Sequence, residues 1–488
     1  MLHLDVIITP NKPAESAMHF QKQRYYQMES KLVPSDTLLD EGVNIANVHQ
    51  GNPYNPWIIY PLDPVANIAA KAFSQRMHKG GAKVKSYYSS GSLSFITPEL
   101  WAFFSMYGEL MSHPAYVDPI PPPTPPPMTA EQEWQAAVAA PVFISHHWFL
   151  EHAGTALFSS DWTTPLATPS HSPVCEGCDM DVSFTTRANS RLANFWARLL
   201  VLATEELDID GIYLDGVAYD SHTMLRAMRA VSEGRGMGGE SGGMMDLHCG
   251  NRWPSGGGEI DVLEYAQHMS LMDSVMFGEG FDDGGTTACK DRQSGTCGDA
   301  TWMLLATSGM QFGLFNDMLT DVNLFRGMVF AMWGRPPYSN GAQNKQLWEW
   351  IDSSGLADNS TEMLGFWADQ EDWHAVVTSS VADVKATAYL VQPTKGAPGQ
   401  VIIAVASWVQ GGTATFSLTL DLEAIVSKVQ GWEALDSSEL MVETPAISTV
   451  QNASTLGKGL VGLSLAPRAG MLLAVRPKRT GAQRTRQY

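Results

Sequence analysis

Two apolar runs in the sequence end in carboxylates. The run "GIYLDG" (211–216) carries Asp215, and "SVMFGEG" (274–280) carries Glu279. Two carboxyl groups that face one cavity can cleave a glycosidic bond, because a protonated one assists the leaving oxygen while an ionised one stabilises or attacks the anomeric carbon. An apolar setting raises the pKa of a carboxyl group, so Glu279 suits the acid and Asp215 the nucleophile or charge stabiliser. The sequence therefore predicts a catalytic carboxylate pair.

Other polar and aromatic residues lie at or just after apolar runs. Asn52 opens the aromatic stretch "NPYNPWIIY", which suits stacking on a sugar face. Side chains alternate along a strand, so Asp246 and His248 share a face. We predict that one set of residues at strand ends binds substrate: His49, Asn52, Tyr88, Asp246, His248, Asn251, Trp253 and Asp317.

Three alternatives remain open for these residues. An Asp at a strand end can cap the following turn, and Glu279 can be a loop salt-bridge partner. A barrel that binds carbohydrate without catalysis would use the same placement. A metal-dependent hydrolase could use His49, Asp246 and His248, although no HxH or HExxH spacing supports it.

No metal or cofactor is predicted. Cys175 and Cys178 have the spacing of metal ligands, but a structural zinc site needs a second pair. No glycine fingerprint of a dinucleotide-binding fold follows the first expected strand.

The elements that must position these residues alternate between strands and helices. The expected strands are 5–10, 43–49, 83–89, 211–216, 244–249, 274–280 and 310–316, with a less certain one within 325–334. Apolar strands that alternate with helices indicate a parallel sheet buried on both faces. Seven or eight such units favour an α/β fold of the (β/α)8 TIM type, whose active site lies at the carboxyl ends of the strands.

The pattern changes after residue 372. Short strands separated by Gly-rich turns predict an antiparallel β-sandwich over 373–477. The barrel is expected over 1–372, with a Pro-rich insertion near 113–140, and a disordered basic tail over 478–488.

Composition limits the partners. The chain of 488 residues has a formal net charge of -20, which argues against nucleic acid because phosphate binding needs a basic face. No apolar stretch approaches the length of a membrane span. The first residues lack the succession of a secretory signal, and the abrupt start leads to the hypothesis that an upstream segment is missing. The expected partner is a carbohydrate substrate.

The ordered motifs "VNIANVHQGN", "KVKSYYS", "DGIYLDGVAYD", "MDLHCGN" and "FGEGF" resemble glycoside hydrolase family 123-like proteins. The resemblance covers nearly the whole chain and implies a barrel with an attached β-sandwich. Characterised members are β-N-acetylgalactosaminidases in which the substrate acetamido group is the nucleophile, assisted by an adjacent Asp-Glu pair.

This sequence departs from that pattern, because Gly216 rather than Glu follows Asp215. The pair Asp40–Glu41 precedes the second expected strand and would lie at the other end of the barrel. An Asp on the fourth strand with an acid on the sixth instead resembles retaining α-galactosidase-type barrels. The resemblance therefore implies a glycosidase acting on a galactoside or an N-acetylgalactosaminide.

Overall fold

The computed structural model divides the chain into two compact units, which separate between Val275 and Met276, and each is described by itself. The residues that the structure describes are 23–28, 31–49, 52–55, 64–88, 92–94, 99, 102–103, 106, 181–183, 190–215, 221–234, 243–248, 268, 271–276, 324–329, 336, 341–358, 360–366, 376–394, 398–409, 411–433, 435, 439–445, 459–467 and 469–478. The strands expected at 5–10 and 310–316, the Pro-rich insertion and nearly all of the basic tail lie outside these residues.

The first unit is built on a parallel sheet whose strands follow one another in space as they do in sequence. The order is β1-β2-β3-β6-β7-β8, and the pairs from β1 to β7 are parallel. The strands are β1 (Tyr25–Met28), β2 (Ile45–Val48), β3 (Lys83–Tyr88), β6 (Gly211–Asp215), β7 (Met244–His248) and β8 (Ser274–Met276). All but β1 confirm strands expected from the sequence. A small antiparallel pair of strands, β4 (Ser92–Ser94) and β5 (Asp181–Ser183), was not expected.

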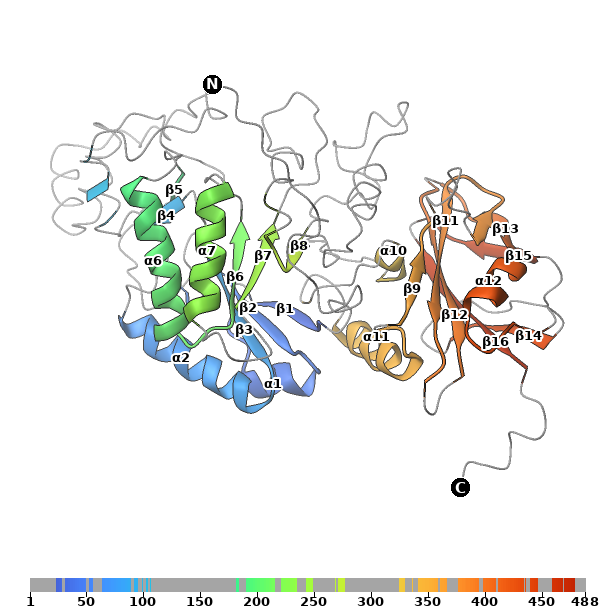
Figure 1. Ribbon diagram of the computed structural model, residues 1–488, viewed down its shortest axis with the longest axis horizontal. Coiled ribbons are helices and arrows are strands. Elements are labelled where there is room, and N and C mark those ends of the chain that lie inside the picture. Colours follow the sequence, from blue (N-terminus) through green and yellow to red (C-terminus); the bar gives the residue numbers. More distant parts are fainter. Residues whose placement is uncertain are drawn as a thin grey trace, which may run out of the picture. The chain divides into compact units, whose positions relative to one another are not determined.

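Helices connect these strands, as Figure 1 shows in blue and green. They are α1 (Ser35–Asp40), α2 (Pro64–Lys79), α6 (Arg191–Glu206) and α7 (Ser221–Gly234). The helix α6 begins where the Ser190 side chain accepts a hydrogen bond of 3.0 Å from the backbone N–H of Ala193. Its buried residues, among them Leu192, Trp196 and Leu200, recur every four positions and form one apolar face.

The two faces of the sheet differ in what they carry. On one face, Tyr88 packs edge-on against Trp196 of α6, with ring centroids 6.0 Å apart. We call the opposite face the inner face. Its residues occupy two lateral rows of the register: Gln27, Asn47 and Lys85 in the first, and Tyr87, Tyr213 and Asp246 in the second. All six are buried.

The sheet is strongly curved toward the inner face. The Lys85 ammonium lies 2.6 Å from each carboxylate oxygen of Asp246 on β7 and 5.5 Å from the ring centroid of Tyr25 on β1. In a flat sheet, four strand spacings would separate β1 from β7 by about 19 Å. One amine can reach side chains from both strands only because the sheet curls around it.

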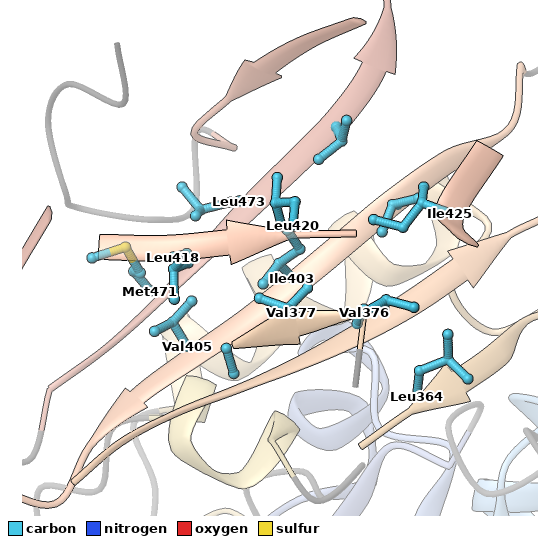
Figure 2. Packing of buried hydrophobic residues seen from close by; sticks show 14 of the residues in the cluster. Leu364, Val376, Val377, Ile403, Val405, Leu418, Leu420, Ile425, Met471 and Leu473 are labelled. Carbon is cyan, nitrogen blue, oxygen red and sulfur yellow. The ribbon is translucent and has the colours of Figure 1, made fainter. Parts of the chain in front are cut away.

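The second unit has two antiparallel sheets. One contains β10 (Val377–Ser379), β13 (Ala414–Leu420) and β15 (Gly459–Leu465), and the other has the order β14-β16-β12-β11-β9. The members of the larger sheet are β14 (Leu440–Glu443), β16 (Gly470–Pro477), β12 (Gln400–Ser407), β11 (Val384–Val391) and β9 (Glu362–Leu364). Figure 2 shows one apolar core built from both sheets, with Leu418 and Leu420 of β13 beside Ile403 of β12 and Leu473 of β16. The short helix α12 (Leu422–Lys428) adds Ile425 to this core.

The strand β12 is buried on both faces. Its odd-numbered residues, such as Ile403, belong to the core between the sheets, while Ile402 and Ala404 on the other face are also fully buried. On the neighbouring strand β11, the Thr387 hydroxyl donates a hydrogen bond of 2.7 Å to the carbonyl of Val329, and the Tyr389 hydroxyl donates one to the carbonyl of Met328. These carbonyls belong to the end of α10 (Leu324–Met328), which therefore caps this face.

The described part of the stretch 325–334, in which we expected a strand, is helical instead: residues 324–328 form the helix α10, with Leu324 and Met328 buried one turn apart. Residues 330–334 lie outside the described residues. The strand β9, which ends at Leu364 and so precedes the domain boundary expected at residue 373, pairs with β11 of the larger C-terminal sheet. The helix α11 (Gly341–Ser354) also belongs to this second unit.

Candidate active site

Three aromatic rings meet where β2, β3 and β6 end. The His49 ring directly follows β2, and its centroid lies 4.3 Å from that of Tyr87 and 6.3 Å from that of Tyr213. The two tyrosine rings are 5.8 Å apart. Both tyrosines are buried, at 3% and 2% exposure, whereas His49 is partly exposed. Within this aromatic cluster, His49 is the member that solvent reaches, and the tyrosines hold its ring from behind.

The backbone of His49 is also fixed. Its N–H donates a hydrogen bond of 2.9 Å to the carbonyl of Met28, which extends the pairing of β1 and β2 by one residue. His49 therefore stands at the carboxyl end of the sheet, on a backbone position set by its neighbouring strand. This is the edge at which parallel sheets of this class bind their ligands.

Tyr88, which we expected to contact substrate, lies elsewhere. It is buried on the helix-covered face against Trp196, whereas its neighbour Tyr87 lies on the inner face beside His49. The motif "KVKSYYS" contains both tyrosines, and alternation requires that only one of them share a face with Lys85. The sequence alone did not indicate which face looked inward, so the residue that it missed is Tyr87.

The loop after β2 is held by two asparagines. Asn52 is fully buried, and its side-chain oxygen accepts a hydrogen bond of 3.0 Å from the backbone N–H of Tyr54. Asn55 donates from its side chain to the carbonyl of Tyr87, at 3.3 Å, and thereby ties the loop to β3. The ring of Tyr54 stacks on Phe73 of α2 with centroids 4.9 Å apart. The structure thus places Asn52 within the turn that carries the loop.

A fully buried ion pair joins Lys85, two rows below the strand ends, to Asp246, one row below them. Asp246, expected near the substrate, receives two contacts of 2.6 Å from the Lys85 ammonium, and neither side chain is exposed. Lys85 was not among the expected site residues, although a lysine that is buried within a strand requires a buried partner. Because both oxygens of Asp246 bind Lys85, the carboxylate is engaged below the strand ends.

Asp215 and His248 occupy neighbouring strand ends. Asp215 is the last residue of β6, His248 is the last residue of β7, and they are register partners. The structure describes their backbone only. The other expected site residues lie outside the described part of the chain: Glu279, Asn251, Trp253 and Asp317.

The described residues contain no group of three or more His, Cys, Asp or Glu side chains placed to hold a metal ion. No helix among them is long and apolar enough to cross a membrane.

Comparison with known families gives two matches that follow one another along the chain. The glycoside hydrolase 123 TIM-barrel domain matches residues 15–337, and the glycoside hydrolase 123 C-terminal domain matches residues 343–476. The chain belongs to glycoside hydrolase family 123. This confirms the resemblance drawn from the strand-end motifs, and it makes the chain a glycosidase with a TIM-barrel domain and a C-terminal domain.

Solved structures agree with this family 123 fold. A noncanonic maltogenic α-amylase, AmyB from Thermotoga neapolitana, matches with a TM-score of 0.51 at 11% identity, over 93% of this chain and 98% of that chain. A cycloisomaltooligosaccharide glucanotransferase from Paenibacillus sp. matches with a TM-score of 0.51 at 8% identity, over 93% of this chain and 85% of that chain. At these identities the likeness concerns the fold alone. A search of curated proteins found no match.

Proposed function

We propose that this family 123 glycosidase hydrolyses an O-glycosidic bond of a galactoside or an N-acetylgalactosaminide, with Asp215 and Glu279 as its carboxylate pair. The observation that carries the proposal is the meeting of strand ends on the inner face. His49, Tyr87 and Tyr213 are in ring contact there, and Asp215 follows Tyr213 by two residues on the same strand.

The role of Asp215 follows from its position. Residues two apart on a strand share a face, so Asp215 belongs on the face of Tyr213. Its carboxylate would stabilise or attack the anomeric carbon, while Glu279 after β8 would protonate the leaving oxygen. A nucleophilic Asp215 requires carboxyl groups about 5–5.5 Å apart and retains the anomeric configuration, whereas about 6.5–9.5 Å implies inversion.

Substrate contacts are assigned around this pair. His49 is the partly exposed member of the aromatic cluster, so it is the first candidate for a hydrogen bond to the sugar. His248, Asn251, Trp253 and Asp317 extend the proposed set. Tyr88 is not included, because it packs on α6. His49→Ala should raise KM, while Tyr88→Phe should leave KM and kcat unchanged.

The sugar class rests on a departure from the family pattern. Gly216 follows Asp215, so the adjacent Asp-Glu pair that assists an acetamido nucleophile is not formed there. A galactoside, which needs no acetamido group, is then the first substrate to test, and an N-acetylgalactosaminide the second.

We propose two finer features of the fold. The curvature that lets Lys85 reach both β1 and β7 supports a barrel that closes. The shared core of the two C-terminal sheets supports a β-sandwich.

The test is a panel of aryl galactosides and N-acetylgalactosaminides of both anomers. Asp215→Asn keeps the side-chain shape and removes the charge, so turnover should be abolished. Glu279→Gln removes the transferable proton and should slow poor leaving groups far more than activated ones. Exposed residues give matched controls, Asp36→Asn and Glu423→Gln, which should behave as the wild type.

Each failure has its own signature. Equal losses on good and poor leaving groups would deny Glu279 the acid role, and an active Asp215→Asn variant would refute the scheme. Sugar binding without turnover by the wild type would favour a non-catalytic carbohydrate-binding barrel. Metal in the purified protein that is needed for turnover would favour a metal-dependent hydrolase instead.

A further inference from the structure

The floor of the inner face is polar and buried. Gln27, Asn47, Lys85 and Asp246 come from four different strands, and none is exposed to solvent. The Asn47 side-chain amide donates a hydrogen bond of 2.7 Å to the Gln27 side-chain oxygen, and Lys85 binds both oxygens of Asp246. Barrel interiors of this class are filled mainly by branched apolar side chains. A polar layer directly below the strand ends therefore calls for a reason.

The ion pair bridges three strands. Lys85 lies on β3 and its lateral partner on β6 is Gly211, while Asp246 lies on β7. The pair thus connects β3 and β7, the two neighbours of β6, across Gly211, where β6 has no side chain. Lys85 lies two residues before Tyr87, and Asp246 lies two residues before His248.

Stability is a weak explanation for such a pair. Removing two charges from water costs about as much as their attraction returns, and an apolar pair of equal volume is often as stable. A buried ion pair can, however, select one arrangement of the strands, because an arrangement that parts the two charges leaves each of them buried without a partner. What the pair supplies is a set distance between β3 and β7.

We propose that Lys85 and Asp246 are positioning residues for the active site, which set the spacing of the strand ends that carry Tyr87, Asp215 and His248. The inference rests on the proposed function. It assigns neither residue a contact with substrate, because both are fully buried.

The test compares four variants with the wild type on the best aryl glycoside. Lys85→Met and Asp246→Asn each remove one charge, and Lys85→Met/Asp246→Leu removes both and keeps the layer filled. The control is Asp210→Asn at the amino end of β6, where the Asp210 carboxylate accepts hydrogen bonds of 2.8 Å from the His78 ring and from the N–H of Val84. Asp210 holds the same sheet together but lies at the opposite end from the strand tips.

If Lys85 and Asp246 position the active site, removal of both charges should lower kcat far more than it changes KM. The double variant should fold, keep KM within a few-fold and lose about 100-fold in kcat, the size of loss expected when reacting groups are displaced by about 1 Å. The single variants should move the acidic limb of the pH profile of kcat/KM in opposite directions. Lys85→Met leaves a buried anion and should move the limb to higher pH, whereas Asp246→Asn leaves a cation and should move it to lower pH. Asp210→Asn should lower Tm and change neither kcat nor the pH profile.

Two outcomes would overturn the proposal. One is a double variant with the kcat of the wild type. The other is a set of variants whose losses follow Tm alone, with Asp210→Asn as impaired as the rest. If the wild type turns over no glycoside, the proposed function fails separately, and affinity for galactose and N-acetylgalactosamine becomes the readout. The double variant should then bind a few-fold more weakly than Asp210→Asn, and equal binding would refute positioning.

Discussion

Replacing Lys85 by Met should destabilise the first unit more than almost any other single change on its inner face. The ammonium is 2.6 Å from both oxygens of Asp246, and both side chains have zero exposure. Removal of one partner leaves a buried carboxylate without compensation, which costs about 3–5 kcal/mol. For a unit of this size, the loss corresponds to a fall in Tm of about 6–20 °C.

The measurement should follow the first unit alone, since the chain has two units and a single global transition is not assured. Hydrogen exchange of peptides from β3 and β7 in increasing urea gives the local free energy of opening. Lys79→Met is the matched control, because Lys79 is exposed in the last turn of α2 and its loss should cost less than about 1 kcal/mol. Lys85→Met/Asp246→Leu should recover most of the loss. The reasoning is refuted if Lys85→Met stays within about 1 kcal/mol of the wild type.

Two further predictions concern close packing. A Cβ added at Gly211 would lie 2.3 Å from the backbone oxygen of Met244, so Gly211→Ala should force β6 and β7 apart. We expect the free energy of unfolding in urea to fall by about 1–3 kcal/mol or more. Gly411→Ala is the control and should leave this free energy unchanged, because the space around Gly411 is open. Ile403→Ala opens a cavity in the C-terminal core and should cost about 2–5 kcal/mol, whereas Thr415→Ala on an exposed position of β13 should shift the transition by less than about 1 kcal/mol. Equal effects of either variant and its control would contradict the packing described.

The strands of the parallel sheet could be predicted where apolar residues run together. "GIYLDG" and "MMDLHC" are of this kind, and both form strands at the expected positions. The strand β1 was not predicted, because "YYQM" is four residues long and carries Gln27, whose burial depends on the partner Asn47 from another strand. Local sequence does not report a partner that arrives from elsewhere in the chain.

The sequence could place candidate residues at the ends of strands, but it could not tell which face of the sheet each of them occupies. Alternation separates Tyr87 from Tyr88, but the helix that covers one face decides which of them lies inside. The start of the stretch 325–334, in which we expected a strand, is helical for a similar reason. Its apolar residues suit a strand or a helix equally, and burial of Leu324 and Met328 one turn apart decides for the helix.

The attachment of α10 to the larger C-terminal sheet limits how this protein can be cut and recombined. A fragment that begins at residue 373 would lack β9 and would leave the hydroxyls of Thr387 and Tyr389 without the carbonyls of Val329 and Met328. Even a cut in the interval 337–343, where the two family domains adjoin, removes these acceptors. Transfer of the C-terminal unit to another protein, whether by gene fusion or in evolution, therefore requires the segment from Leu324 onward to travel with it.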